Sequence, residues 1–466
     1  MYKKILFIFI IYFFTACGGG STSESTLIPE NNETIPTEDF NESNETNIAT
    51  NVNPLFYQQW YLDKNDTFYS ANSIDDDAHI HMVDDNITGN GVVVAIIDNG
   101  FDVTHPDIAS NIIATRSFST NRWGNIFTSE DVSHSLSTDY HGTSVAGIVA
   151  AFNNDIGIKG VAPNVDLVLI KMPTSFTDEV YYAMFDYAVS QGAQVISCSW
   201  GTGNVSQDIR DYINQLVETT GVIIVFAAGN SDALIEDDES SIKNVIAVGA
   251  TDKDNLRTAY SSYGKELDIV APGGYSLGIT TIDPLGADGA VNGDYIEYDD
   301  AAAFVGTSAA APIVSGSIAL LLEKEPSFTF FDVLEKIKLS SDHIGQDTPY
   351  LDEIISSNSD MPNITGIFGA SGFDQFELNI TNQSSSLQYG PYPLGLNGDN
   401  TFFVNVTDSL VDGNYTLELF GTADATIFAT DELLIIDQLG ENISNPTIKK
   451  SDFYGYGKLN VTKLLE

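Results

Sequence analysis

The stretch GVVVAIIDNG, residues 91–100, is an apolar run that stops at an aspartate followed by Asn and Gly. Short apolar runs of this kind are typical of strands buried on both faces of a sheet. Six such runs alternate with stretches of helical periodicity: Val92–Ile97, Leu167–Ile170, Val195–Ser199, Val222–Ala227, Val245–Val248 and Leu267–Val270. The alternation predicts an α/β fold with a mostly parallel sheet covered by helices on both faces.

Polar residues follow the apolar runs at three informative places. Asp98 ends the first run, and His141 opens the helical stretch in DYHGTSVAGIVAAF. Ser308 lies in GTSAAAP, residues 306–312, just before an apolar run that predicts a buried helix over Ala309–Leu322. The hydroxyl of Ser308 then lies in the field of a helix N-terminus, where backbone N–H groups are unpaired. That position suits a nucleophile whose attack creates an oxyanion.

A serine hydroxyl is a poor nucleophile until a base takes its proton, and an imidazole oriented by a carboxylate can do so near neutral pH. Alone, Asp98 is typical of a turn and His141 of a helix cap. Together, in the order Asp, His, Ser, the segments around Asp98, His141 and Ser308 resemble those of the subtilisin-like serine peptidases, the subtilases. The resemblance covers residues 53 to about 345 and 449–466. It implies a three-layer α/β/α sandwich and a serine endopeptidase that works through an acyl-enzyme.

The same resemblance assigns residues that would hold the substrate. Asn230 ends VIIVFAAGN and matches the asparagine that donates to the oxyanion, together with the N–H of Ser308. Two segments resemble the walls of the first specificity pocket, formed by Ser199, Trp200 and Gly201 on one side and by Ala227, Ala228 and Gly229 on the other. Backbone pairing there tolerates many sequences, so the expected substrate is a protein or peptide.

The sequence allows two interpretations of which substrate side chains the pocket prefers. Five acidic residues closely follow Asn230: Asp232, Glu236, Asp237, Asp238 and Glu239. A carboxylate at the floor of the pocket would favour a Lys or Arg side chain in the substrate. That reading favours a narrow processing enzyme resembling the kexin-like branch, whereas a solvated acidic loop favours a general degrading enzyme.

The loop at Phe152–Ile158 interrupts the helix that begins at His141 and resembles the loop that wraps Ca²⁺ in subtilisins. Irregular oxygen donors suit this cation. The resemblance implies backbone oxygens from Phe152, Ile156 and Ile158 and side-chain oxygens from Asn154, Asp107 and Asn53. The alternative is a plain Asn-rich turn.

The N-terminal segment carries Lys3 and Lys4, followed by an apolar run and then Cys17. We interpret residues 1–17 as a secretory signal. Its end resembles a bacterial lipobox, which implies export and a lipid anchor on Cys17 at the outer membrane or cell surface. Ordinary cleavage and an uncleaved anchor are the alternatives. The net charge of −46 excludes a nucleic-acid partner and fits a soluble surface, a saline habitat or calcium loading. We expect a monomer.

Composition divides the remaining chain. Residues 18–52 are polar and predict a disordered tether, and residues 53–347 predict the catalytic domain. Residues 348–448 carry alternating runs such as Phe376–Ile380 and Tyr415–Phe420, which predict a small β-rich insertion, and residues 449–466 close the catalytic domain. An alternative function is a surface-binding protein that acts through this insertion and carries a vestigial peptidase. Cys198 is expected to be a buried small hydrophobe.

Overall fold

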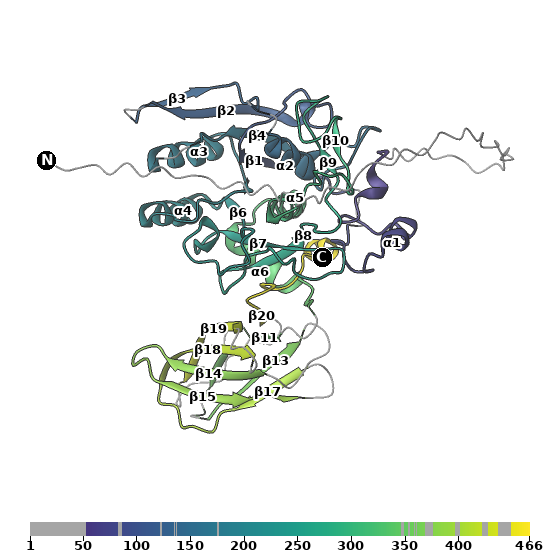
Figure 1. Cartoon of the computed structure of the whole chain (residues 1–466). Coiled ribbons are helices and arrows are strands. Elements are labelled where there is room, and N and C mark those ends of the chain that lie inside the picture. Colours follow the sequence, from purple (N-terminus) through teal and green to yellow (C-terminus); the bar gives the residue numbers. More distant parts are fainter. Residues whose placement is uncertain are drawn as a thin grey trace, which may run out of the picture.

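The structure is a computed structural model that describes residues 53–82, 86–121, 124–134, 136, 138–174, 177–345, 349–352, 355–357, 359, 361–368, 376–396, 401–421, 427–436 and 449–466. The expected signal, the tether and Cys17 lie outside these residues. Two parts are visible in Figure 1, a larger α/β body and a smaller β structure below it. No helix among the described residues is both long and apolar enough to cross a lipid bilayer.

An eight-stranded sheet forms the centre of the body, with the strand order β3-β2-β4-β1-β5-β6-β7-β8. Its strands are β1 (Val93–Asp98), β2 (Ile112–Thr120), β3 (Ile126–Ser129), β4 (Asp166–Lys171), β5 (Val195–Cys198), β6 (Ile223–Ala227), β7 (Ile246–Thr251) and β8 (Ile269–Pro272). All pairings are parallel except that of the edge strand β3 with β2. Each of the six predicted runs overlaps a strand, so the predicted sheet is confirmed.

Helices complete a three-layer arrangement. They are α1 (Asp66–Asn72), α2 (His141–Ala150), α3 (Asp178–Ser190), α4 (Gln207–Thr220), α5 (Thr307–Lys324), α6 (Phe330–Ser340) and α7 (Val461–Leu465). Helices α2 and α5 pack against each other, as do α3 and α4. The residues of α5 from Thr307 to Leu322 are all buried, which fits a helix with apolar or small side chains on every side.

The β structure is built from two further five-stranded sheets. One has the order β16-β17-β13-β11-β20 and the other β12-β19-β18-β14-β15. The strands are β11 (Pro349–Asp352), β12 (Ile355–Ser357), β13 (Asn363–Phe368), β14 (Phe376–Asn382), β15 (Gln388–Pro393), β16 (Gly395–Leu396), β17 (Thr401–Asn405), β18 (Gly413–Gly421), β19 (Ile427–Ile436) and β20 (Lys449–Lys450). A separate two-stranded sheet in the body pairs β9 (Thr281–Ile282) with β10 (Tyr295–Ile296).

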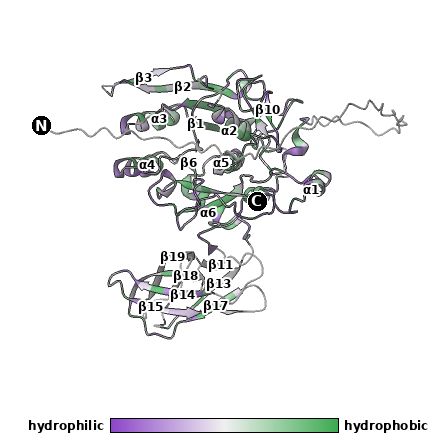
Figure 2. Ribbon diagram, viewed as in Figure 1, coloured by the Kyte–Doolittle hydropathy of each residue, from purple (hydrophilic) through white to green (hydrophobic). Residues whose placement is uncertain are grey.

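Each part has its own hydrophobic core. Ile364, Leu378, Phe402 and Leu417 belong to a cluster that draws on both sheets of the β structure and excludes the body. Figure 2 shows hydrophilic and hydrophobic colours mixed along these strands. Alternating burial along β14 explains the mixture, because one face of each strand points into the cluster.

The chain end returns to the body. Lys450 of β20 still pairs with Leu351 of β11. The backbone of Lys458 then forms isolated β-bridges with Val270 and Asp342. Helix α7 packs on α5 and α6. The β structure therefore interrupts the body between α6 and α7.

Candidate active site

Asp98 and His141 meet where β1 ends and α2 begins. The Nδ1 atom of His141 lies 3.0 Å from both carboxylate oxygens of Asp98. The side chain of Asp98 is fully buried, whereas that of His141 is 15% exposed. Gly142 makes this approach possible, because a Cβ at that position would come within 2.4 Å of the Gly100 carbonyl oxygen. One ring nitrogen of His141 is thus held by a buried carboxylate.

Ser308 is the second residue of α5 and lies inside the helix, although the sequence placed it just before one. Its Oγ donates a hydrogen bond to the backbone oxygen of Ser199 at 3.0 Å. In return, the hydroxyl of Ser199 donates to the backbone oxygen of Ser308 at 3.0 Å. Pro312 has no N–H, so the Ser308 carbonyl has no partner one turn later and is available to Ser199.

Asn230 lies beside the start of α5. Its Oδ1 accepts hydrogen bonds from the N–H of Thr307 at 2.9 Å and from the Thr307 hydroxyl at 3.0 Å. Its amide nitrogen lies 3.2 Å from where a Cβ on Gly306 would stand, at a backbone φ of 135°. Gly306 is therefore required here, because a side chain would strain the backbone and crowd the amide. Among the described residues, no protein acceptor is paired with that amide nitrogen.

The sequence reasoning missed two residues that hold this constellation. The Thr307 hydroxyl accepts from the N–H of Gly229 at 3.2 Å while it donates to Asn230. The ring of Phe304 lies 5.4 Å from the His141 ring, centroid to centroid. Thr307 was visible as the middle residue of Gly-Thr-Ser, but nothing in the sequence marked Phe304.

The two expected pocket walls end neighbouring strands. Ser199 and Trp200 follow β5, and the indole N–H of Trp200 donates to the Ile97 carbonyl at 2.8 Å, so this side chain is part of the core. Ala227 ends β6 and Ala228 follows it, hydrogen-bonded through its N–H to Val248. Cys198 is buried, as expected, and burial raises the pKa of its thiol well above the usual value.

The five acidic residues separate into different roles. Asp232 forms an ion pair with Arg257 at 3.0 Å, and Glu236 and Asp237 are exposed. Asp238 and Glu239 instead lie against the segment that follows Trp200. The acidic loop therefore contains both exposed carboxyl groups and carboxyl groups that are bonded to the rest of the protein.

The residues expected to bind calcium converge on one place. The Asn53 amide nitrogen contacts the backbone oxygens of Phe152 at 3.2 Å and of Ile158. Asn154 donates to Oδ1 of Asp107 at 3.0 Å and accepts from the N–H of Ile156. Burial raises the pKa of Asp107, although Asn154 and Tyr295 donate to its carboxylate. Two carbonyl oxygens and the Asn154 amide of this loop thus lie beside the Asn53 amide and the buried carboxylate of Asp107, and oxygen donors of these types fit an oxygen-preferring cation.

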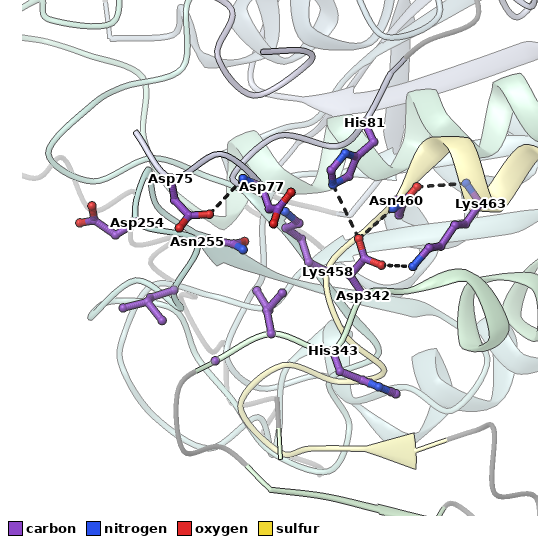
Figure 3. Close-up of a pocket in the computed structure, with 13 residues that line it drawn as sticks. Asp75, Asp77, His81, Asp254, Asn255, Asp342, His343, Lys458, Asn460 and Lys463 are labelled. Atoms are coloured by element: carbon purple, nitrogen blue, oxygen red, sulfur yellow. Dashed lines mark hydrogen bonds and ion pairs between the residues drawn. The ribbon is translucent and has the colours of Figure 1, made fainter. Parts of the chain in front are cut away.

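A cavity of about 600 Å³ lies where the chain end rejoins the body (Figure 3). Asp342 at its edge accepts hydrogen bonds from Asn460 at 2.8 Å and from Lys463. The side chain of Lys458 is fully buried there, and burial lowers its pKa to about 8. None of the residues around this cavity belongs to the Asp98, His141 and Ser308 group. We interpret the cavity as the place where polar and charged side chains attach the chain end to the body.

Comparison with known proteins matches residues 89–360 to the family described as the Subtilase family. The chain is 32% identical to subtilisin NAT of Bacillus subtilis subsp. natto over 270 residues, 56% of this chain and 64% of that protein. It is also 33% identical to the alkaline protease of Alkalihalobacillus alcalophilus, over 59% of this chain and 65% of that protein. The alignments thus span slightly less than two thirds of these relatives.

Solved structures agree on the fold. A serine protease of Aeromonas sobria superposes with a TM-score of 0.55 at 18% identity, over 85% of this chain and 94% of that one. A protease of Pseudoalteromonas arctica gives a TM-score of 0.50 at 24% identity, over 62% of this chain and 91% of that one. The matched family region and the order of the strands together show that this chain belongs to the subtilase family.

Proposed function

We propose that the chain is an exported serine endopeptidase that hydrolyses protein or peptide substrates. The observation that carries this proposal is the contact between buried Asp98 and His141 at the carboxyl end of the central strand β1, with Ser308 in the first turn of α5 bonded to Ser199 at the end of the neighbouring strand β5. A histidine oriented in this way can act as a base through its other ring nitrogen. The membership of the subtilase family supports the same reaction.

In the proposed reaction, Ser308 Oγ leaves the Ser199 carbonyl and passes its proton to Nε2 of His141 while Oγ bonds to the substrate carbonyl carbon. Asp98 stabilises the imidazolium through Nδ1. The Ser308 N–H and the Asn230 amide donate to the oxyanion. The amine leaves with the proton from His141, and water then attacks the acyl-enzyme by the same route in reverse.

A peptide blocked at both ends tests this proposal, because an endopeptidase needs no free terminus. The wild-type chain should cleave it, and Asn230→Ala should lower kcat about 100- to 1000-fold with little change in KM, since the oxyanion exists only in the transition state. Cleavage restricted to peptides with a free terminus, or an Asn230→Ala variant as fast as the wild type, would contradict the proposal.

We also propose a structural Ca²⁺ held by Asn53, Asp107, Asn154 and the carbonyls of Phe152, Ile156 and Ile158. The N–H of Leu55 already donates to the Gly157 carbonyl at 2.8 Å, so the start of the folded chain lies on this loop. When bound, the cation would neutralise the buried carboxylate of Asp107 and fix that contact.

A lipid on Cys17 would tether the exported enzyme to a membrane, as the lipobox-like sequence suggests. Partition of the full-length chain into detergent after expression in bacteria, lost in Cys17→Ala, is the expected result. Equal partition of both proteins would contradict the anchor.

A further inference from the structure

The cavity in Figure 3 is enclosed by four segments that lie far apart in the chain. Its lining comes from residues 75–81, 254–256, 342–345 and 458–463. Two of these segments are the places where the chain leaves the body for the β structure and returns from it. The volume of about 600 Å³ lies within the usual range of small-molecule sites. The cavity is therefore large enough to hold a ligand at this junction.

Lys458 brings an unpaired positive charge to this cavity. Its side chain is fully buried, and Nζ has no hydrogen-bond partner among the described residues. Burial lowers its pKa to about 8, so the amine still holds its proton at neutral pH. The nearby carboxylate of Asp342 is bonded to Asn460 and Lys463 instead. A buried ammonium without an acceptor is unfavourable, and an acidic group entering the cavity would satisfy it.

Asn255 presents an unused acceptor to the same cavity. Its Oδ1 is buried and receives no hydrogen bond from any described residue. The residue has a backbone φ of 59°, which asparagine tolerates, and its N–H donates to the Asp252 carbonyl at 3.1 Å. The turn therefore fixes the position of this side chain. A molecule that satisfied both Lys458 and Asn255 would need an acceptor and a donor.

The charge changes sign across the cavity. Lys458 is fully buried, whereas the carboxylates of Asp75, Asp77 and Asp254 belong to exposed residues at the mouth. Asp254 is paired with Lys253 at 2.8 Å. Asp75 and Asp77 act electrostatically on Lys458, but neither forms an ion pair with a described Lys or Arg. A simple anion would be repelled at the mouth and a simple cation by Lys458, whereas a molecule that carries both charges matches both ends.

We propose that this cavity binds a small zwitterion, a free amino acid or a short peptide. Its carboxylate lies against Lys458 and its ammonium group faces Asp75 and Asp77, while Oδ1 of Asn255 accepts an N–H. The site is separate from the proposed catalytic residues, and the inference does not depend on the proposed function. The bound molecule would also link segments 342–345 and 458–463, whose backbones already pair through Asp342 and Lys458 at 2.8 Å.

Titration calorimetry with glycylglycine on the full, calcium-loaded chain tests the proposal. The dipeptide should bind saturably to one site. N-acetylglycylglycine lacks the ammonium group and glycylglycinamide lacks the carboxylate, so each should bind at least about 10-fold more weakly. Lys458→Met, which keeps the length of the side chain but removes its charge, should lower the affinity for glycylglycine about 10- to 100-fold.

Asn255→Gly is a second variant, because glycine accepts the same backbone conformation and removes only the acceptor. It should weaken binding about 2- to 10-fold. Lys338→Met is the matched control, since the Lys338 ammonium lies over the Tyr456 ring, 5.1 Å from its centroid, and does not line the cavity. Its affinity for glycylglycine should equal that of the wild type.

Three results would overturn the inference: folded wild-type chain that does not bind glycylglycine at millimolar concentration, capped dipeptides that bind as tightly as the free one, or binding that Lys458→Met leaves unchanged. If Lys458→Met does not fold, the capped dipeptides and Asn255→Gly decide the question. Cleavage of a doubly blocked peptide by the same preparations reports on the proposed function independently, because no cavity residue belongs to the proposed catalytic group.

Discussion

The strands of the body and those of the β structure bury their side chains in different patterns. In the body, β1 carries five buried residues in succession, because helices cover both faces of a parallel sheet. In the β structure, β14 alternates between buried and half-buried residues, because only one face of each sheet reaches the shared core. All three proposed triad residues lie in the body, at the ends of elements that other elements hold on every side.

This difference explains why the proposed catalytic residues lie in the body. Asp98 can be fully buried as a carboxylate because the dense body supplies His141 and the N–H of Asn99 as partners. The β structure holds the chain between α6 and α7 and has a core of its own. The comparison predicts that the two parts respond separately to substitution, metal and pH.

The largest expected effect is on catalysis and is confined to the body. Asp98→Asn should lower kcat about 10⁴-fold, because His141 loses the carboxylate that fixes its tautomer and stabilises its charge. Tyr392→Phe, in the β structure, removes only a hydroxyl that bonds Asp408 and should leave kcat unchanged. Steady-state kinetics of both variants measures the difference, and similar losses in the two would break the comparison.

Separate cores should give separate unfolding transitions. Leu378→Ala in β14 and Ile96→Ala in β1 each remove a fully buried side chain, at an expected cost of about 2–5 kcal/mol. Calorimetry should show Leu378→Ala lowering one transition and Ile96→Ala the other, with kcat/KM unchanged by Leu378→Ala. One transition that moves equally in both variants would show a single cooperative unit.

Calcium removal should act on the body alone. With free Ca²⁺ at about 100 times its Kd, binding stabilises the folded state by about 2.7 kcal/mol, and a chelator removes that contribution. The body transition should fall by several degrees, while the transition of the β structure stays constant. Asp107→Asn should abolish the dependence on chelator, and a variant that still responds fully would place the cation elsewhere.

Acid should also distinguish the two parts, because none of the chain's six histidines lies in residues 348–448. Burial, with charge repulsion from His81 and Lys458, lowers the pKa of His79 to about 4, and its Nδ1 accepts from the N–H of His81. The unfolded chain therefore binds more protons between pH 6.5 and 4. Stability is complete above about pH 6.5 and falls toward pH 4, by up to about 3 kcal/mol.

His79→Asn, which keeps an acceptor near Nδ1, should flatten this decline in the body transition. Thermal unfolding at half-unit pH steps measures it. An equally steep decline in the variant would assign the acid sensitivity to other groups, such as His343, whose pKa burial also lowers to about 4.

Much of the body could be predicted from sequence because buried parallel strands are apolar throughout and end in recognisable turns. The six runs and the helix of Ser308 follow from that rule. Strands β2 and β3 were missed, because Ile112–Thr120 mixes polar and apolar residues and β3 pairs at a mostly exposed edge. Periodicity gives little warning of such strands.

Contacts between residues distant in sequence were harder to predict. The ion pair of Asp232 with Arg257 and the hydrogen bond from Gly203 to Asp238 give the acidic residues different surroundings, which composition alone could not predict. The bond between Ser199 and the Ser308 carbonyl depends on Pro312, which the sequence displays but whose consequence requires the packing of α5 on β5. Tertiary proximity, which the sequence pattern does not encode locally, decides these cases.

Labelling with a fluorophosphonate probe tests the central claim most directly, because the probe reacts only with a serine whose proton is removed by a neighbouring base. Calcium-loaded, folded wild-type chain should be labelled on Ser308, and Ser308→Ala and His141→Ala should not be labelled. Ser144→Ala, which alters a buried serine bonded to the Ile282 carbonyl, should label as the wild type does. A folded wild type that stays unlabelled, or label on another serine, would contradict the account.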